Sequence, residues 1–162
     1  MASNYFLEIE GIEGESADDK HKGALEIESF SWGLTQLGSF AGRGGGAAGK
    51  ASFQDFHFTK LVDKASPKLF FACASGEHIK KATLFVRKSG ERHLDYYQVS
   101  LQDVLVSSYQ AAGADGNIGA VPVDSFALNY AKIVFSYTPQ NGDGTALPAV
   151  QAGWDLIQNK KI

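Results

Sequence analysis

Hydrophobic and polar residues alternate along much of this 162-residue chain, a pattern typical of strands that bury one face. The first such segment covers residues 5–10, where Tyr5, Leu7 and Ile9 are predicted to share the buried side. A polar loop is predicted over residues 11–20. The chain therefore begins with a half-buried strand and a long connection.

The next segment, residues 24–37, reads as one long strand whose buried face changes partway. Leu25 and Ile27 lie on one face, whereas Phe30 and Trp32 lie on the other. Side chains alternate strictly along a strand, so the change requires a bulge or a new buried side near Ser29. Beyond this point a row of small residues faces away from the aromatic side chains, comprising Ser29, Ser31, Gly33 and Thr35. Such a row cannot form a core.

Further strands are predicted over residues 51–61, 82–87, 94–107, 124–138 and 154–158. The strand over 94–107 shifts phase at Val104, which marks a second candidate bulge. The strand over 124–138 is expected to be the longest and is apolar on both faces, which predicts that both faces are covered.

One helix is predicted, and its start and end carry recognisable signals. Ser66 is expected to be the N-cap, Pro67 the first helical residue, and Gly76 the C-terminal cap. The apolar residues that recur at helical spacing are Leu69, Phe70, Cys73 and Ala74. With its many strands and this helix, the chain is expected to be mainly β: an antiparallel β-barrel or sandwich with one short α-helix, forming a single domain over residues 1–162.

Composition and charge exclude several function classes. A 44% hydrophobic content can fill a core, and the single Cys73 excludes an internal disulfide framework. The net charge of −3 offers no basic stripe for nucleic acid. The N-terminus lacks a signal peptide, and no segment is apolar for long enough to span a bilayer. We expect synthesis in the cytoplasm, no membrane insertion, and any export to avoid the general secretory route.

The glycine-rich stretch 42–50 nearly matches the sequence motif of a phosphate-binding loop. Gly44 and Gly49 bracket four residues and Lys50 follows, but Ala51 stands where the loop needs a hydroxyl residue to hold magnesium. A strand is predicted after it, where the motif requires a helix. We favour a pliable loop between strands, and an ATPase remains a third hypothesis.

Other patterns fail to define a reaction centre. His21, His57, His78 and His93 match no zinc spacing, and a calcium-loop spacing at 115–119 lacks its closing glutamate. Glu26 and Glu28 share a strand face, which we interpret as a solvated edge. We therefore expect no catalytic residue, no metal, no cofactor and no enzymatic activity.

Long strands with few interior charges leave edges that attract another chain. Such a protein is predicted to assemble with itself, and identical subunits joined head to tail give a ring when the rotation closes. A monomeric module that binds a ligand on the face of Ser29, Ser31 and Thr35 is the alternative from another class.

Several short motifs in series resemble the haemolysin-coregulated protein (Hcp) family, the tube subunit of bacterial type VI secretion. They are Gly14-Glu15-Ser16, Ser31-Trp32-Gly33, Gly44-Gly45-Gly46-Ala47-Ala48-Gly49-Lys50, Phe58-Thr59-Lys60, Asp63-Lys64-Ala65-Ser66-Pro67, Ala72-Cys73-Ala74-Ser75-Gly76, Val104-Leu105-Val106-Ser107-Ser108 and Gly153-Trp154. The resemblance runs nearly end to end.

The resemblance implies a hexameric ring that stacks into a secreted tube, with a spike protein at the tip, a contractile sheath, and small effector proteins in the lumen. A contractile phage tail-tube subunit is the neighbouring alternative. The family's ring-stacking loop corresponds to Gly42, Arg43, Gly44, Gly45, Gly46, Ala47, Ala48, Gly49 and Lys50. Ser31, with Ser29, Gly33 and Thr35, would face the lumen, with Trp32 packed behind. Arg43 departs from an otherwise neutral loop and leaves open whether stacking uses a charge pair.

Overall fold

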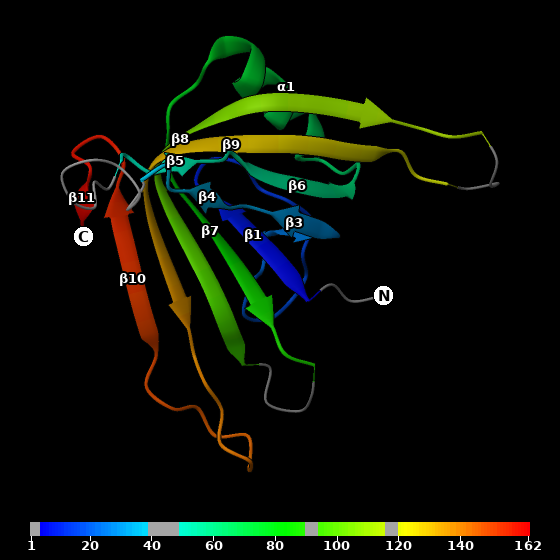
Figure 1. Ribbon diagram of the computed structural model, residues 1–162. Coiled ribbons are helices and arrows are strands. Elements are labelled where there is room, and N and C mark those ends of the chain that lie inside the picture. Colours follow the sequence, from blue (N-terminus) through cyan, green and yellow to red (C-terminus); the bar gives the residue numbers. More distant parts are fainter. Residues whose placement is uncertain (1–3, 39–48, 90–93, 116–119) are drawn as a thin grey trace.

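The computed structural model describes residues 4–38, 49–89, 94–115 and 120–162, and antiparallel strands dominate it (Figure 1). Its elements are β1 (Tyr5–Ile9), β2 (Leu25–Ile27), β3 (Ser29–Ser31), β4 (Leu34–Thr35), β5 (Ser52–Phe53), β6 (Phe56–Leu61), α1 (Ser66–Ser75), β7 (Ile79–Arg87), β8 (Asp95–Ala112), β9 (Val123–Tyr137), β10 (Val150–Asp155) and β11 (Lys160–Lys161).

The strands form two layers that share their longest members. One layer follows the order β11-β10-β9-β8-β7-β1-β2, while β9 also pairs with β6, and β6 pairs with β3. Figure 1 shows β8 and β9 bending at the corner where the layers meet, so that each strand contributes one half to each layer. The mainly β, antiparallel fold class predicted from the sequence is confirmed.

The bend explains the phase changes seen in the sequence. Along β8 the buried residues pass from Val99 and Leu101 to Val104 and Val106, and Asp103 between them has a positive φ of 54°. Asp103 therefore turns the strand so that its core side swaps, and the β8–β9 register shifts slightly later, between Val106 and Ser108. The predicted irregularity near Val104 is confirmed.

Strand β9 corrects two predictions. It spans 15 residues, whereas β8 spans 18, so β9 is not the longest strand. Its apolar residues on both faces mainly reflect the same bend: Leu128 and Tyr130 are buried in one layer, and Ile133 in the other. A strand that passes from one layer to the other needs apolar side chains first on one face and then on the other. The apolar residues on both faces of β9 therefore come only in part from positions where both faces are covered.

The predicted change of face near Ser29 is a change of partner strand. β2 pairs with β1, and β3 pairs with β6, with Glu28 between them. The segment predicted as one strand over 24–37 is thus three short strands, and the sheet does not close into a barrel. Among the described residues, the strands form one open nine-stranded sheet that bends into two layers and a separate two-stranded sheet of β4 and β5.

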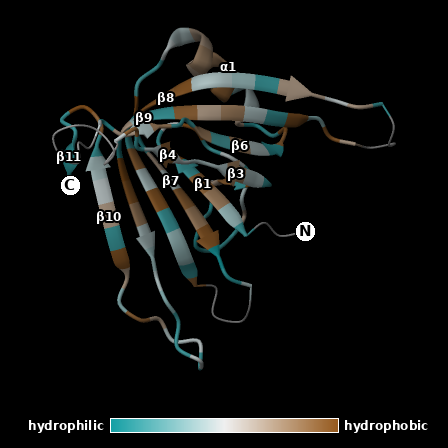
Figure 2. Cartoon of the chain, in the orientation of Figure 1, coloured by the Kyte–Doolittle hydropathy of each residue, from teal (hydrophilic) through white to brown (hydrophobic). Residues whose placement is uncertain are grey.

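The core between the layers is aromatic. Phe56 and Phe58 stack with ring centroids 4.7 Å apart, and Phe58 stacks on Phe126 at 5.2 Å. All three side chains are almost fully buried, and each contributes about 1.5–3 kcal/mol by leaving water. Figure 2 shows hydrophobic residues alternating with hydrophilic ones along these strands, so each strand divides between core and surface.

The helix lies where predicted, with two corrections. Its N-cap is Ala65, which has no side-chain cap, so Ser66 is the first helical residue and Pro67 the second. The Ser66 hydroxyl bonds instead to the buried side chains of Lys60 and Asp124. Gly76 is the left-handed C-cap, with φ of 65°. The buried face consists of Ser66, Leu69 and Ala72, whereas Phe70 is 61% exposed. In the described part of the chain, no helix has the length and apolarity needed to cross a bilayer.

Several predicted strands have different bounds: β7 begins at Ile79 rather than at residue 82, and β8 continues to Ala112 rather than ending at residue 107. The segment 51–61 is broken into β5, which pairs with β4, and β6. The closing strand is β10, which ends at Asp155, because the Asp155 carboxylate accepts hydrogen bonds from the backbone N–H groups of Ile157 and Gln158 in a turn before β11.

Candidate functional site: a polar strand face and an acidic cleft

Ser29 and Ser31 of the predicted polar row lie on the outside of the layer formed by β3, β6 and the first half of β9, whereas Thr35 belongs to β4, which pairs with β5 in a separate two-stranded sheet. Ser29, Ser31 and Thr35 are exposed, and Gly33 is half-buried. Ser29 and Ser31 alternate with the half-buried Phe30 along β3, which separates a polar outer face from an apolar inner one.

Neighbouring strands extend this outer face beyond the predicted row. Ser31 pairs with His57 on β6, and His57 pairs with Ala127 on β9. His57, Ser107 and Asn129 add exposed side chains. Sequence reasoning missed them, although the alternation of residues 56–61 already placed His57 opposite Phe56 and Phe58. We call the surface of Ser29, Ser31, His57, Thr59, Ser107 and Asn129 the polar face.

Side chains of the polar face bond to one another. The hydroxyl oxygens of Ser29 and Thr59 lie 2.5 Å apart. Asp55 accepts hydrogen bonds from the Ser107 hydroxyl at 2.7 Å and from the Asn129 amide at 3.0 Å. One carboxylate thus holds both the Ser107 hydroxyl and the Asn129 amide on the exposed face, where their oxygens can still accept hydrogen bonds from a docked surface.

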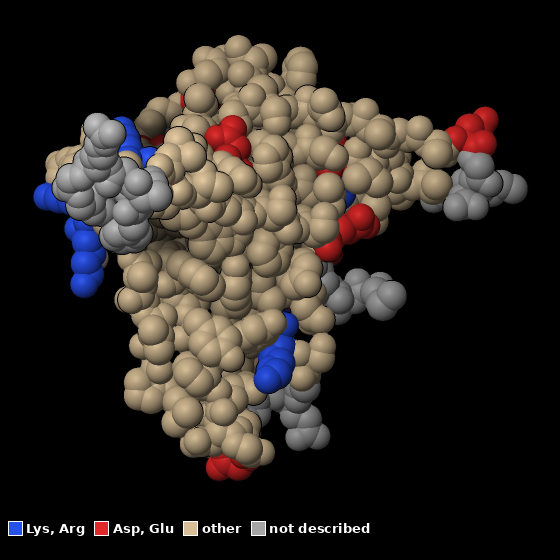
Figure 3. All heavy atoms as spheres, in the orientation of Figure 1, with Lys and Arg blue, Asp and Glu red and all other residues tan. Residues whose placement is uncertain are grey.

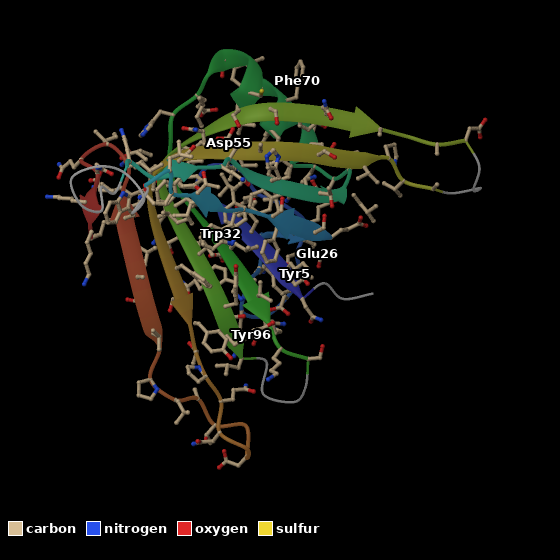
Figure 4. The ribbon with its side chains drawn as sticks, in the orientation of Figure 1. Tyr5, Glu26, Trp32, Asp55, Phe70 and Tyr96 are labelled. Atoms are coloured by element: carbon tan, nitrogen blue, oxygen red, sulfur yellow. The ribbon has the colours of Figure 1, made fainter. Side chains whose placement is uncertain are left out.

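Trp32 lies behind the polar face, as the sequence predicted. Its ring stacks on Phe56 with centroids 5.8 Å apart and meets Phe135 edge-on at 5.3 Å. Its indole N–H donates to the Tyr97 hydroxyl at 2.8 Å. Burial raises the pKa of Tyr97, so this hydroxyl stays neutral. Figure 4 places Trp32 between the layers, where it anchors the strand that carries Ser31.

A buried ionic cluster fixes the far end of the same layer. Lys60 and Asp124, both fully buried, face each other across β6 and β9 with Nζ 2.9 Å from Oδ2. Asp124 also accepts hydrogen bonds from the hydroxyls of Ser66 and Tyr109. Burial favours the neutral acid, but the hydrogen bonds from Ser66, Tyr109 and Lys60 outweigh it and lower the pKa of Asp124. Burial and the Asp124 carboxylate raise the pKa of Tyr109 to about 12.

The glycine-rich loop lies mostly outside the described residues, which include only its last two positions. Gly49 and Lys50 are exposed, and Lys50 lies beside Phe53, Trp154 and Leu156. The chain then enters strand β5 rather than a helix, so the helix N-terminus required by a phosphate loop does not follow Lys50. The roles predicted for 42–48, including that of Arg43, stay predictions.

An open cleft lies where the two layers separate. Glu15, Glu26 and Glu28 are among its exposed lining residues, together with the ends of β6 and β7. Figure 4 shows Glu26 at this end of the molecule, beyond Tyr5. The predicted solvated edge of Glu26 and Glu28 is therefore the wall of a cleft, which we call the acidic cleft.

These features define a class of protein: an antiparallel β protein with structured outer surfaces suited to binding. Among the described residues, no three His, Cys, Asp or Glu side chains gather in a way that could hold a metal ion. Charged groups instead pair across strands or face outward.

Comparison with known proteins identifies the family. The family described as "Type VI secretion system effector, Hcp" matches residues 6–137, and the chain belongs to this family. It is 39% identical over 161 residues to the protein Hcp1 of Pseudomonas aeruginosa, covering 98% of each chain.

Solved structures agree over the whole chain. The structure described as that of a type six secretion system protein has 31% identity and a TM-score of 0.93, covering 99% of this chain and 100% of its own. Hcp1 from Salmonella typhimurium has 34% identity and a TM-score of 0.82, with all of both chains covered. This family consists of type VI secretion proteins, so the resemblance stated from the sequence is confirmed.

Proposed function

We propose that this chain is a structural subunit that forms hexameric rings, that the rings stack into the secreted tube of type VI secretion, and that effector proteins travel in the lumen. The observation that carries the proposal is the end-to-end match, in sequence and fold, to Hcp proteins. The partners are further copies of the chain, a spike protein at the tip, a contractile sheath, and effectors. Secretion takes place with the tube.

The polar face supports a lumen wall. Its hydroxyl, imidazole and amide groups offer both donors and acceptors, which can bond to varied cargo surfaces without fixing one partner. The strand carrying Ser31 is held from behind by Trp32, so the face keeps its shape when nothing is bound. A face of this kind favours transient contact over tight binding.

Replacing Ser31 with Gln tests this role. The longer amide should leave the ring intact and reduce retention of small effector proteins encoded with the same secretion system. Light scattering measures particle mass, expected at several times the 17.4 kDa of one chain, and co-purification measures retention.

The matched control is Ser75→Gln, since Ser75 is exposed at the end of α1, outside the polar face. It should change neither mass nor retention. Particles of single-chain mass in the wild type, with a ligand lost on Ser31→Gln, would support the monomeric binding module and contradict the proposal.

A further inference from the structure

Three glutamates at the acidic cleft have no ion-pair partner among the described residues: Glu15, Glu26 and Glu28. Two other charged residues of the lining are already neutralised inside the fold. Asp63 pairs with Lys60 at 2.7 Å, and Arg87 pairs with Asp18. Lys88 is the remaining cation of the lining, so the cleft carries an excess of negative charge.

The other end of the molecule carries the opposite charge. Lys50, Lys160 and Lys161 are exposed there, and no ion pair engages them in the described ranges. β11 brings Lys160 and Lys161 against β10, and Lys50 lies beside Trp154 of the same strand. Figure 3 shows Lys and Arg side chains gathered at this end. We call Lys50, Lys160 and Lys161 the basic corner.

Exposed apolar side chains accompany both charged surfaces. At the cleft, Leu61 and Val121 are 46% and 49% exposed. At the basic corner, Ile157 and Ile162 are 76% and 57% exposed. Ile162 packs beside Gly153 of β10, which places it with Lys161. Apolar groups next to unpaired charges of one sign are typical of a surface that meets a partner of the opposite sign.

We propose that the basic corner of one copy docks in the acidic cleft of a second copy, and that this head-to-tail contact joins one ring to the next. The inference rests on the proposed tube and names the surfaces that stack. The occupant is a second copy because the two complementary surfaces lie at opposite ends of one chain. A contact between different surfaces leaves a free cleft at one end and a free corner at the other, so it can add copies without limit where its rotation does not close a ring.

The contact is electrostatic at its rim, which sets its salt dependence. Exposed charges are screened over about 8 Å at 0.15 M ionic strength and about 3 Å at 1 M. Raising the salt concentration should therefore shorten stacks of rings while leaving each ring whole. Ring integrity relies on other surfaces and should not follow the same curve.

Disulfide trapping tests the contact directly. In a Cys73→Ser background, which removes the only cysteine, Glu28→Cys and Lys160→Cys are made as separate variants. Rings of the two variants are purified, mixed and oxidised. We expect disulfide-linked chains in the mixture and none when either variant is oxidised alone. A mixture that forms no disulfide, or a variant that cross-links with itself, would overturn the inference.

A double variant, Glu28→Cys with Lys160→Cys, separates stacking from contact within a ring. If the contact joins rings, oxidation should give disulfide-linked species larger than the mass of one ring. Linked species that never exceed the mass of one ring would overturn the stacking contact. Light scattering before oxidation distinguishes a failure of the proposed ring assembly from a failure of the stacking contact. Variants that are monomers contradict the proposed function, and rings that never cross-link contradict only the stacking contact.

Charge reversal provides the second measurement. Glu26→Lys with Glu28→Lys, or Lys160→Glu with Lys161→Glu, should reduce ring-to-ring association about tenfold or more, because several like charges then face each other. Combining all four substitutions in one chain should restore it. The control Glu10→Lys with Glu77→Lys matches the net-charge change of the Glu26→Lys with Glu28→Lys variant, at exposed positions outside the cleft, and should leave association unchanged. Equal loss in the control would contradict the contact.

Discussion

Two polar clusters join distant parts of this fold, and they differ in how fully their atoms are paired. The first, the Lys60 cluster, consists of Lys60, Asp63, Ser66, Tyr109 and Asp124, and Lys60 donates to both carboxylates and to Ser66. The second, the Arg87 cluster, consists of Asp18, His21, Arg87 and Asp95. In it three buried atoms lack a hydrogen-bond partner: His21 Nδ1, Arg87 Nε and Asp95 Oδ1.

The difference reflects what each cluster holds. The Lys60 cluster fastens β6, β9 and the start of α1 to one another, all of them regular elements. The Arg87 cluster fastens the loop over 11–23 to the outside of β7, through two hydrogen bonds of 2.5 and 2.7 Å from Arg87 to Asp18. Two of the three unpaired atoms, Arg87 Nε and Asp95 Oδ1, face each other across β7 and β8 at 4.0 Å, which is beyond hydrogen-bond range. The strand register shifts at this point, between Val86 and Arg87, so the two groups do not meet in hydrogen-bonding geometry.

The Lys60 cluster should show the largest effect on stability. Lys60→Met removes the cation beside the buried Asp124 carboxylate, and the free energy of unfolding should fall by about 3–5 kcal/mol. Urea unfolding at fixed protein concentration measures it. Lys64→Met is the control, since Lys64 is exposed, and it should stay within about 0.5 kcal/mol. If Lys60→Met lowered the free energy of unfolding no more than Lys64→Met does, the Lys60 cluster would not stabilise the fold.

The Arg87 cluster should contribute less, because Asp18 is partly exposed. Asp18→Asn weakens the paired hydrogen bonds to Arg87, and the free energy of unfolding should fall by about 2 kcal/mol at neutral pH. The exposed neighbour allows the control Asp19→Asn, which should have little effect.

The same pair predicts the pH dependence. The hydrogen bonds from Arg87 hold the pKa of Asp18 well below its usual value of 3.8. A lowered pKa stabilises the fold above the unfolded value, and this stability is lost as the pH falls below about 4. Asp18→Asn should flatten the acid limb of the curve of unfolding free energy against pH. An unchanged acid limb would contradict this role of Asp18.

A neutral hydrogen bond should have the smallest effect. Tyr97→Phe leaves the Trp32 indole N–H without its acceptor, and the free energy of unfolding should fall by about 1 kcal/mol. Thermal unfolding measures it, with Tyr137→Phe as the control because Tyr137 is 46% exposed. A loss as large as that of Lys60→Met would remove the distinction between charged clusters and neutral bonds.

Local patterns predicted the strands well, because alternation depends on neighbours in the chain. The change of side at Ser29 and the phase shift at Val104 were both visible as breaks in alternation, and each marks a place where the chain passes between strands or layers. The N-cap was misplaced by one residue because the Ser66 hydroxyl bonds to Asp124, 58 residues away.

No local sequence pattern predicted the Lys60 cluster, the Arg87 cluster or the acidic cleft. Asp18 lies 69 residues from Arg87, and Lys60 lies 64 residues from Asp124. Glu26 and Glu28 were visible as a pair on one strand face, but their cleft forms only where the layers separate. The row of Ser29 and Ser31 could be found from alternation, whereas His57 and Asn129 join it only through strand pairing.

The most direct measurement is an electron micrograph of the purified wild-type protein. If the protein is a ring-forming subunit, the micrograph should show ring-shaped particles with six-fold symmetry and an open centre. A field of separate particles, each with the mass of one chain at every concentration, would contradict this account.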